Sequence, residues 1–362
     1  RGGYTSGLPR CLEGARYYAQ WAGAPYKVYG GRKGENDYAD DINTRSLMTN
    51  WLGGGSVYMP ARKGKHVPIE LSLALHSDAG YNKDGKTTFG ALAICTTDYN
   101  DGILNSGISR FTSKDFARAL RDNLVTDLTA QFGEFGKRYL WDRNYSETRL
   151  PEVPSAILEM LSHQNFPDMR IAQDPLGKFY IARSIYKTIL RFVNSNHGTR
   201  YVVQPLAPQN FSVTQNQGVA LLSWTAQLDK TEPSARPTSY IIYKAEGQGG
   251  FDNGTIVNTT RCQMQLKPGK LYHFKVAAVN AGGESFTTET LSVLYNPAAS
   301  KSVLIVNNFH RLASPQVVDD EEKQGFDLNQ DPGVSYGLTA GWSGKQQACD
   351  RSRMGNETSI GI

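Results

Sequence analysis

The first half of the chain alternates between short apolar runs and longer stretches in which apolar residues recur every three or four positions. The second pattern predicts helices at residues 8–23, 40–52, 111–132 and 174–193. The apolar runs predict strands at residues 26–29, 67–75, 89–96 and 155–160. Because near-continuous apolar strands belong to sheets covered on both faces, this alternation predicts an α/β three-layer sandwich with a mainly parallel sheet over residues 1–199.

Beyond about residue 200 the helical spacing stops and short strand-like runs follow one another, separated by prolines. The runs cover residues 211–214, 219–224, 239–244, 261–266, 272–280 and 287–295. Many short strands at close intervals are typical of a β-sandwich of about 100 residues. The sequence therefore predicts an all-β domain over residues 200–297.

The pattern of apolar and polar residues changes again near Ser300. Residues 303–307 are predicted as the first strand of a further α/β unit, of which residues 298–362 form only a part. The chain begins with Arg1-Gly2-Gly3, without an initiator methionine or a signal peptide, and ends in turn-like composition. We therefore expect it to be a piece of a longer protein.

Composition argues against two classes of function. Lys and Arg total 39 and Asp and Glu total 34, and a net charge of +5 over 362 residues is too small for a nucleic-acid-binding footprint. No apolar run reaches the roughly 20 residues of a transmembrane helix. The four cysteines, Cys11, Cys95, Cys262 and Cys349, lack metal-binding spacing, and we expect mostly free, buried thiols.

Polar residues that can carry chemistry follow two of the predicted strands. His76 comes directly after residues 69–75, and Glu159 after residues 154–158. In an open α/β sheet, sites form outside the carboxyl ends of the strands. A histidine and a carboxylate placed there suit zinc binding and general-base hydrolysis of an amide. On spacing alone, a purely structural role for His76 stays open.

Residues 203–296 resemble a fibronectin type III domain. The resemblance rests on Trp224, the run 240–243 and the segment 266–285. The resemblance implies that Trp224 fills the space between the two sheets. It also implies that Tyr272 is the corner tyrosine, whose hydroxyl bonds to the backbone upstream. Both roles are structural, and such modules serve as spacers or binding platforms.

Residues 1–195 resemble the type-3 family of zinc-dependent N-acetylmuramoyl-L-alanine amidases, which cleave peptidoglycan stem peptides. The matching blocks are Arg45 with Asn50, the run 71–79 around His76, and the run 154–168 around Glu159, with Asn165 and Pro167-Asp168. The resemblance implies that His76 binds zinc and that Glu159 is the catalytic general base. It implies a structural role for Arg45 and Asn50.

The chain departs from the amidase pattern before His76. The family's Gly-His-Gly-Gly zinc motif and the ligating Glu after it are not found there, so we expect them, and the first strand, upstream of Arg1. A long insertion, residues 51–68, separates Asn50 from the strand that leads to His76. The whole arrangement resembles multidomain secreted bacterial proteins labelled "xanthan lyase", which combine an interrupted amidase-like domain with a fibronectin type III module.

These resemblances predict a zinc-dependent amidase of the bacterial cell envelope that is secreted, periplasmic or on the cell surface, with peptidoglycan or another glycan as partner. The first alternative is a non-catalytic cell-wall or glycan-binding protein on a degenerate amidase fold, which the missing ligands favour for this chain. The second alternative is an enzyme that degrades a polysaccharide such as xanthan.

Three smaller features leave alternatives open. The acidic turn at residues 36–41 serves either to cap a helix, which we favour, or to bind calcium. His163, four residues after Glu159, either reaches the site or lies on the surface. Aromatic residues crowd the N-terminal region and either line a glycan groove or pack the first helix; they are Tyr17, Tyr18, Trp21, Tyr26, Tyr29, Tyr38 and Trp51.

Overall fold

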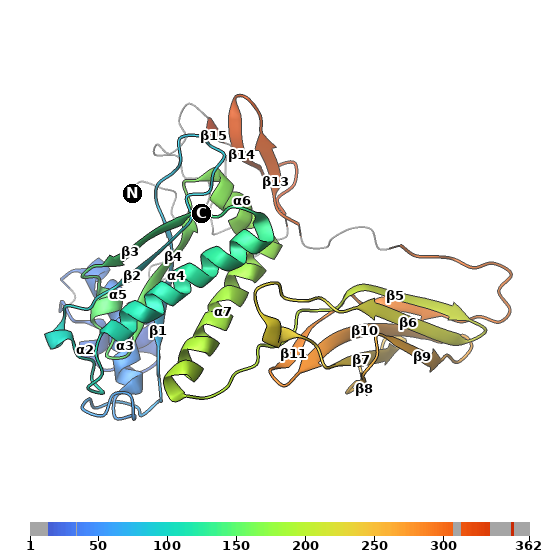
Figure 1. Ribbon diagram of the computed structural model, residues 1–362, viewed down its shortest axis with the longest axis horizontal. Coiled ribbons are helices and arrows are strands. Elements are labelled where there is room, and N and C mark those ends of the chain that lie inside the picture. The colour runs from blue at the N-terminus through green and yellow to red at the C-terminus, as the bar shows by residue number, and fades with distance from the viewer. Residues whose placement is uncertain (1–13, 34, 307–312, 334–348, 351–362) are drawn as a thin grey trace. The chain divides into compact units, whose positions relative to one another are not determined.

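The computed structural model describes residues 14–33, 35–306 and 313–333 and the backbone of residues 349–350. The chain divides into two compact units, Arg1–Phe192 with His310–Ile362, and Val193–Phe309 (Figure 1). The first unit is α/β and the second is all-β, which confirms the predicted change of class along the chain. The predicted domain limits at residues 199 and 297 stay predictions.

The first unit is built on a four-stranded sheet with the order β1-β4-β2-β3. Its strands are β1 (Ser72–Asp78), β2 (Ala91–Cys95), β3 (Lys137–Asp142) and β4 (Ser155–Ser162). β1 runs parallel to β4 and β2 runs parallel to β3, but the central pair β2 and β4 is antiparallel. The predicted mainly parallel sheet is therefore mixed, because β4 enters between β1 and β2 and runs only with β1.

One face of the sheet is covered by α4 (Phe111–Phe132) and α7 (Pro175–His197), which cross in front of it in Figure 1. α4 contributes buried apolar side chains at helical spacing, among them Phe116, Leu120 and Leu124. The strands present small residues such as Ala93 and Ala156 to this helix. Small residues on the sheet let the helix approach closely, so this face holds the main core.

The other face of the sheet carries a smaller apolar cluster of Ala74, Leu92, Ile94, Trp141 and Ile157. Four further helices complete this part of the unit: α1 (Ala15–Trp21), α2 (Tyr26–Tyr29), α3 (Asp37–Gly53) and α5 (Ser146–Arg149). α1 and α2 pack on α3, and α5 packs on α3 and β4. α6 (Phe166–Gln173) follows β4, and a 3-10 helix, η2 (Asn100–Gly102), precedes α4.

Several helices and strands differ from the prediction in their limits or in their type. The helix predicted at 111–132 is confirmed, and the one predicted at 40–52 begins three residues earlier because Asn36 caps it, accepting a hydrogen bond from Ala39 N at 3.0 Å. This contact supports the capping interpretation of residues 36–41. The strand predicted at 26–29 is wrong: it is the helix α2, whose Val28 is buried against its helical neighbours.

The second unit is a sandwich of two antiparallel sheets, β11-β10-β7-β8 with β12 on β10, and β5-β6-β9. Its strands are β5 (Gln209–Asn216), β6 (Val219–Thr225), β7 (Ser239–Glu246), β8 (Thr255–Val257), β9 (Arg261–Gln265), β10 (Leu271–Asn280), β11 (Gly283–Thr287) and β12 (Leu291–Leu294), with a 3-10 helix, η3 (Pro233–Ala235), before β7. Trp224 is buried in the core of the sandwich, and the Tyr272 hydroxyl accepts a hydrogen bond from Lys267 N at 3.3 Å. Both predicted structural roles are confirmed.

The strand predicted at residues 303–307 is wrong for residues 303–306, which form no strand and are exposed; Asn307 lies outside the described residues. Further on, β13 (Gln316–Asp319), β14 (Lys323–Asp327) and β15 (Cys349–Asp350) form a small antiparallel sheet. Phe326 of β14 packs on Phe166 of α6, with ring centroids 5.6 Å apart. None of the described helices is long and apolar enough to cross a bilayer.

Candidate functional site

The fold brings the two predicted site residues, His76 and Glu159, side by side. They are Cα partners in the parallel pair of β1 and β4. Paired residues on neighbouring strands stand on the same face of the sheet, and the strands lie about 4.8 Å apart. Ala74 and Ile157, two residues earlier on each strand, belong to the smaller apolar cluster. His76 and Glu159 therefore lie on the face opposite α4 and α7.

A third ionisable residue, Glu147 of α5, joins His76 and was not anticipated from the sequence. Its Oε2 lies 3.0 Å from His76 Nε2, and its Oε1 accepts a hydrogen bond from Arg45 Nη1 at 2.9 Å. The Glu147 hydrogen bond raises the pKa of His76. Burial opposes ionisation of Glu147, but the bonds from His76 and Arg45 outweigh it and lower the pKa of that carboxyl. The result is a chain of charges that runs from Arg45 through Glu147 to His76.

Glu159 sits in a different environment from Glu147. Its Oε2 is buried and makes no hydrogen bond in the described structure. Burial raises the pKa of this carboxyl; the positive charge of His76 acts against the rise, and Asp78 adds to it. Asp78 is itself paired with Arg138 of β3, whose Nη1 lies 2.7 Å from Asp78 Oδ2. The two glutamates near His76 thus have pKa values shifted in opposite directions, which is a common feature of acid–base pairs.

A cavity of about 320 Å³ opens beside His76. It is lined by Arg45, Ser46 and Thr49 of α3, by residues 72–76 of β1 and by Glu147. Glu159 is not among the lining residues. The open side of the site therefore faces His76 and Glu147, while Glu159 lies one strand further into the sheet.

Zinc stays a prediction. A catalytic zinc takes three protein ligands and keeps a fourth position open. In the described parts of the chain, no group of three or more His, Cys, Asp or Glu side chains is placed to hold a metal ion. The only donor that the resemblance implies, His76, already bonds Glu147 through Nε2. These residues by themselves do not fit a zinc ion.

The remaining predicted residues divide between the site and the scaffold. Arg45, expected to be structural, belongs to the charge chain. Asn50 does hold structure: its side chain donates to Leu150 O at 2.8 Å and accepts from Glu152 N at 3.0 Å. His163 does not join His76, because its Nδ1 bonds Ser77 Oγ at 3.2 Å.

Asp168 also belongs to the scaffold. Its buried carboxylate accepts hydrogen bonds from the backbone N–H groups of Phe89, Gly90 and Ser162, and from the Asn165 side chain. Through these bonds it ties the start of α6 to the end of β4 and to the residues just before β2. Of the four cysteines, Cys95 is buried and Cys262 half-buried, and both are free thiols; nothing is described of the Cys11 and Cys349 side chains.

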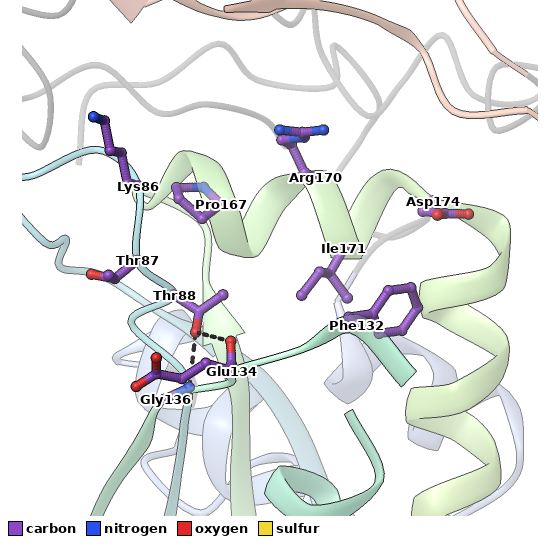
Figure 2. Close-up of a pocket in the computed structure, with 10 residues that line it drawn as sticks. All are labelled: Lys86, Thr87, Thr88, Phe132, Glu134, Gly136, Pro167, Arg170, Ile171 and Asp174. Atoms are coloured by element: carbon purple, nitrogen blue, oxygen red, sulfur yellow. Dashed lines mark hydrogen bonds between the residues drawn. The ribbon is translucent and has the colours of Figure 1, made fainter. Parts of the chain in front are cut away.

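A second, larger cavity of about 480 Å³ lies between α6 and the segments 86–88 and 132–136 (Figure 2). Figure 2 shows Phe132 and Ile171 turned toward each other inside it, and Thr88 bonded at its base to Gly136 N at 2.8 Å and to Glu134 O at 3.3 Å. It contains neither His76 nor Glu159. Its charged residues are of mixed sign and none is a nucleophile paired with a base, so we place the candidate chemistry at the smaller cavity.

Comparison with known proteins identifies a domain in the second unit. Residues 206–293 match the family model of the fibronectin type III domain, and this part of the chain is such a domain. No curated protein matches the chain.

Among solved structures, the twitchin kinase region from C. elegans is 26% identical over 27% of this chain, with a TM-score of 0.24. The titin kinase with its flanking domains is 22% identical over 26% of this chain (TM-score 0.23), and the FN5 domain of Drosophila Lar is 23% identical over 26% (TM-score 0.21). The matches span 18% of the twitchin chain, 17% of the titin chain and 99% of the Lar domain.

Proposed function

We propose that the first unit is a hydrolase of the bacterial cell envelope that cuts the amide bond between a muramoyl group and L-alanine in peptidoglycan. The choice of substrate rests on the resemblance of the blocks around His76 and Glu159 to the amidase family. The observation that carries the proposal is the pairing of these two residues across β1 and β4, with a desolvated carboxyl beside a histidine. The fibronectin type III domain would serve as a spacer or a binding platform for this unit.

In the proposed reaction Glu159 is the general base. Its raised pKa favours this role, because a base works best when its pKa is close to the working pH and burial moves this carboxyl in that direction. Glu159 takes a proton from a water molecule, and the oxygen of that water attacks the carbonyl carbon of the amide. Glu159 then gives the proton to the leaving amine as the carbon–nitrogen bond breaks. Atoms and charges balance without any further reactant.

His76 would stabilise the negative charge that develops on the carbonyl oxygen. Glu147 favours the protonated imidazole and holds the ring through Nε2. A fixed positive group at a developing oxyanion is among the strongest single contributions to catalysis. No step passes through a metal ion, because the described residues do not supply a zinc ligand set.

Turnover of a synthetic muramoyl-L-alanine peptide, followed by release of the peptide amine, tests this proposal. We expect Glu159→Gln to lower kcat by about 10² to 10⁴ fold, the usual contribution of a general base. Glu134→Gln, at an exposed carboxyl of the larger cavity, should leave kcat unchanged and is the matched control. If the wild type is inactive, or if Glu159→Gln cleaves the peptide as fast as the wild type, the hydrolase proposal fails.

A second candidate is a non-catalytic binding protein for peptidoglycan on the same scaffold. It is favoured by the position of Glu159 outside the cavity lining and by the pairing of Arg45 and His76 with Glu147, which already occupies these side chains. In that case the muramoyl peptide would bind without being cleaved, Glu147→Ala would weaken binding, and Glu159→Gln would not. Calorimetry with the intact peptide separates the two candidates.

A further inference from the structure

Residues 14–33 fold into a small helical layer with a buried side and an exposed side. α1 and α2 pack on α3 through small or short side chains, namely Ala19, Ala24 and Val28. The larger aromatic rings are left outside: Trp21 is 58% exposed, Tyr26 53% and Tyr18 52%. Exposed apolar surface marks an interaction site where it is contiguous.

The exposed rings are held in fixed orientations. Tyr18 and Trp21 make an edge-to-face pair, with ring centroids 5.1 Å apart. Tyr26 makes a similar pair with the half-buried Tyr29 at 5.5 Å. The ring of Tyr26 also lies over Gly30, where an added Cβ would collide with it. Rings that are already ordered lose little conformational entropy when a ligand stacks on them.

The same segment carries positive charge without matching negative charge. Residues 14–33 contain Arg16, Lys27, Arg32 and Lys33 and no Asp or Glu. Arg16 is neutralised by Asp37 of α3. The side chains of Lys27, Arg32 and Lys33 are exposed and make no ion pair with any residue that the structure describes. Among residues 14–33, 35 and 36, which the structure describes, Glu35 is the one exposed acid.

The helices α1 and α2 contact each other. We propose that the exposed side chains of Tyr18, Trp21, Tyr26, Lys27, Arg32 and Lys33 together form one surface, the α1–α2 face, which docks an anionic polysaccharide. The C–H groups of sugar rings pack on the electron-rich faces of aromatic rings. The carboxylates of an acidic sugar pair with exposed Lys and Arg side chains. Neutral glycans would leave the three cations unused, and a protein partner would meet lysines that protein interface cores usually lack.

A nucleic acid also combines stacking bases with negative charge, but the observations favour the glycan. Nucleic-acid-binding surfaces carry a broad basic stripe, whereas this face offers three unpaired cations on a chain whose net charge is only +5. The face is separate from the proposed hydrolytic site, because none of its six residues lines the cavity beside His76. Its test is therefore independent of that proposal.

Affinity electrophoresis of the full chain through gels containing polygalacturonate, dextran or a single-stranded oligodeoxynucleotide tests the proposal. We expect polygalacturonate to retard the chain and dextran to retard it little. Trp21→Ala with Tyr26→Ala should weaken the affinity for polygalacturonate at least about tenfold. Tyr139→Ala, at another exposed tyrosine, on β3, should not change it. Lys27→Ala with Lys33→Ala should weaken binding at low salt and remove most of its salt dependence.

The lysine variant alters only exposed side chains, so it keeps the test valid if the aromatic variant does not fold. Absence of retardation by polygalacturonate would overturn the proposal, as would equal retardation by dextran. Stronger retardation by the oligonucleotide would assign the face to nucleic acid instead. Loss of binding in Tyr139→Ala to the same extent as in the aromatic variant would place the binding surface elsewhere.

Discussion

The hydrogen bond between Glu147 and His76 makes a contribution to stability that depends on pH in a defined window. The pKa of His76 is raised on folding, so its stabilisation is fully present below the unfolded value of about 6.5 and is lost as the pH rises through the folded value. The pKa of Glu147 is lowered, so its stabilisation is present above about 4.5 and is lost as the pH falls through the folded value. The pair therefore stabilises the first unit most near pH 5.5, roughly midway between the two.

The size of the effect follows from the exposure of the two groups. The side chain of His76 is 33% exposed and that of Glu147 is 12% exposed. Charge-assisted hydrogen bonds contribute about 1.5 to 3 kcal/mol when well shielded, and exposed ion pairs about 0.2 to 1 kcal/mol. For a partly shielded pair we expect Glu147→Gln to cost about 1 kcal/mol near pH 5.5. Once the pH has passed the folded pKa of His76, the imidazole is neutral and the charge-assisted part of the bond is gone, so the cost should fall to less than about half of that.

Urea unfolding of wild type and Glu147→Gln near pH 5.5 and near pH 8.5 measures the difference. With a denaturant slope of about 2 kcal/mol/M, the midpoint should shift by about 0.5 M at the lower pH and by much less at the higher. The fibronectin type III domain contains no residue of the pair, so its own transition is an internal control. An equal shift at both pH values, or none at either, would refute the coupling between Glu147 and His76.

Three further substitutions test the scaffold around the site. Asp168→Ala leaves three backbone N–H groups without an acceptor, two of them buried, and thermal unfolding should show a loss of about 3 kcal/mol in the first unit. A loss below about 1 kcal/mol would contradict this role. Gly90→Ala places a side chain at a φ of 86° and against the Gly136 carbonyl. Urea unfolding should therefore show a loss of at least about 2 kcal/mol in the free energy of unfolding. An unchanged midpoint would be incompatible with the described backbone. Trp224→Ala should lower the stability of the fibronectin type III domain by about 3 to 5 kcal/mol and leave the α/β transition in place, whereas movement of both transitions would show that the units do not unfold separately.

Local sequence patterns were sufficient to predict the long elements of the fold. α4 could be predicted to the residue because Phe116, Leu120 and Leu124 repeat at helical spacing over many turns. The sandwich could be predicted from Trp224 and Tyr272, whose roles depend on neighbouring sequence. The segment 26–29 could not, because four residues hold too little periodicity and the packing of Val28 decides its conformation. The segment 303–306 has strand-like residues but no described strand to pair with.

The candidate site was predictable only in part. The closeness of His76 and Glu159 follows from two strands that the sequence indicates, but both residues were expected to come after their strands. They lie inside them, because β1 continues to Asp78 and β4 to Ser162. The part played by Glu147 could not be predicted, because it comes from a four-residue helix whose approach to β1 depends on the whole fold. The antiparallel pairing of β2 with β4 could not be predicted from the sequence either, because the apolar pattern of a buried strand does not show its direction.

The most direct test of the hydrolytic account compares the wild-type chain with Glu159→Gln for cleavage of a muramoyl-L-alanine peptide across a range of pH. The account predicts measurable cleavage by the wild type, with a rate that rises as a single carboxyl of raised pKa ionises, and loss of that rise in the variant. Equal rates and identical pH profiles for the two proteins would contradict it.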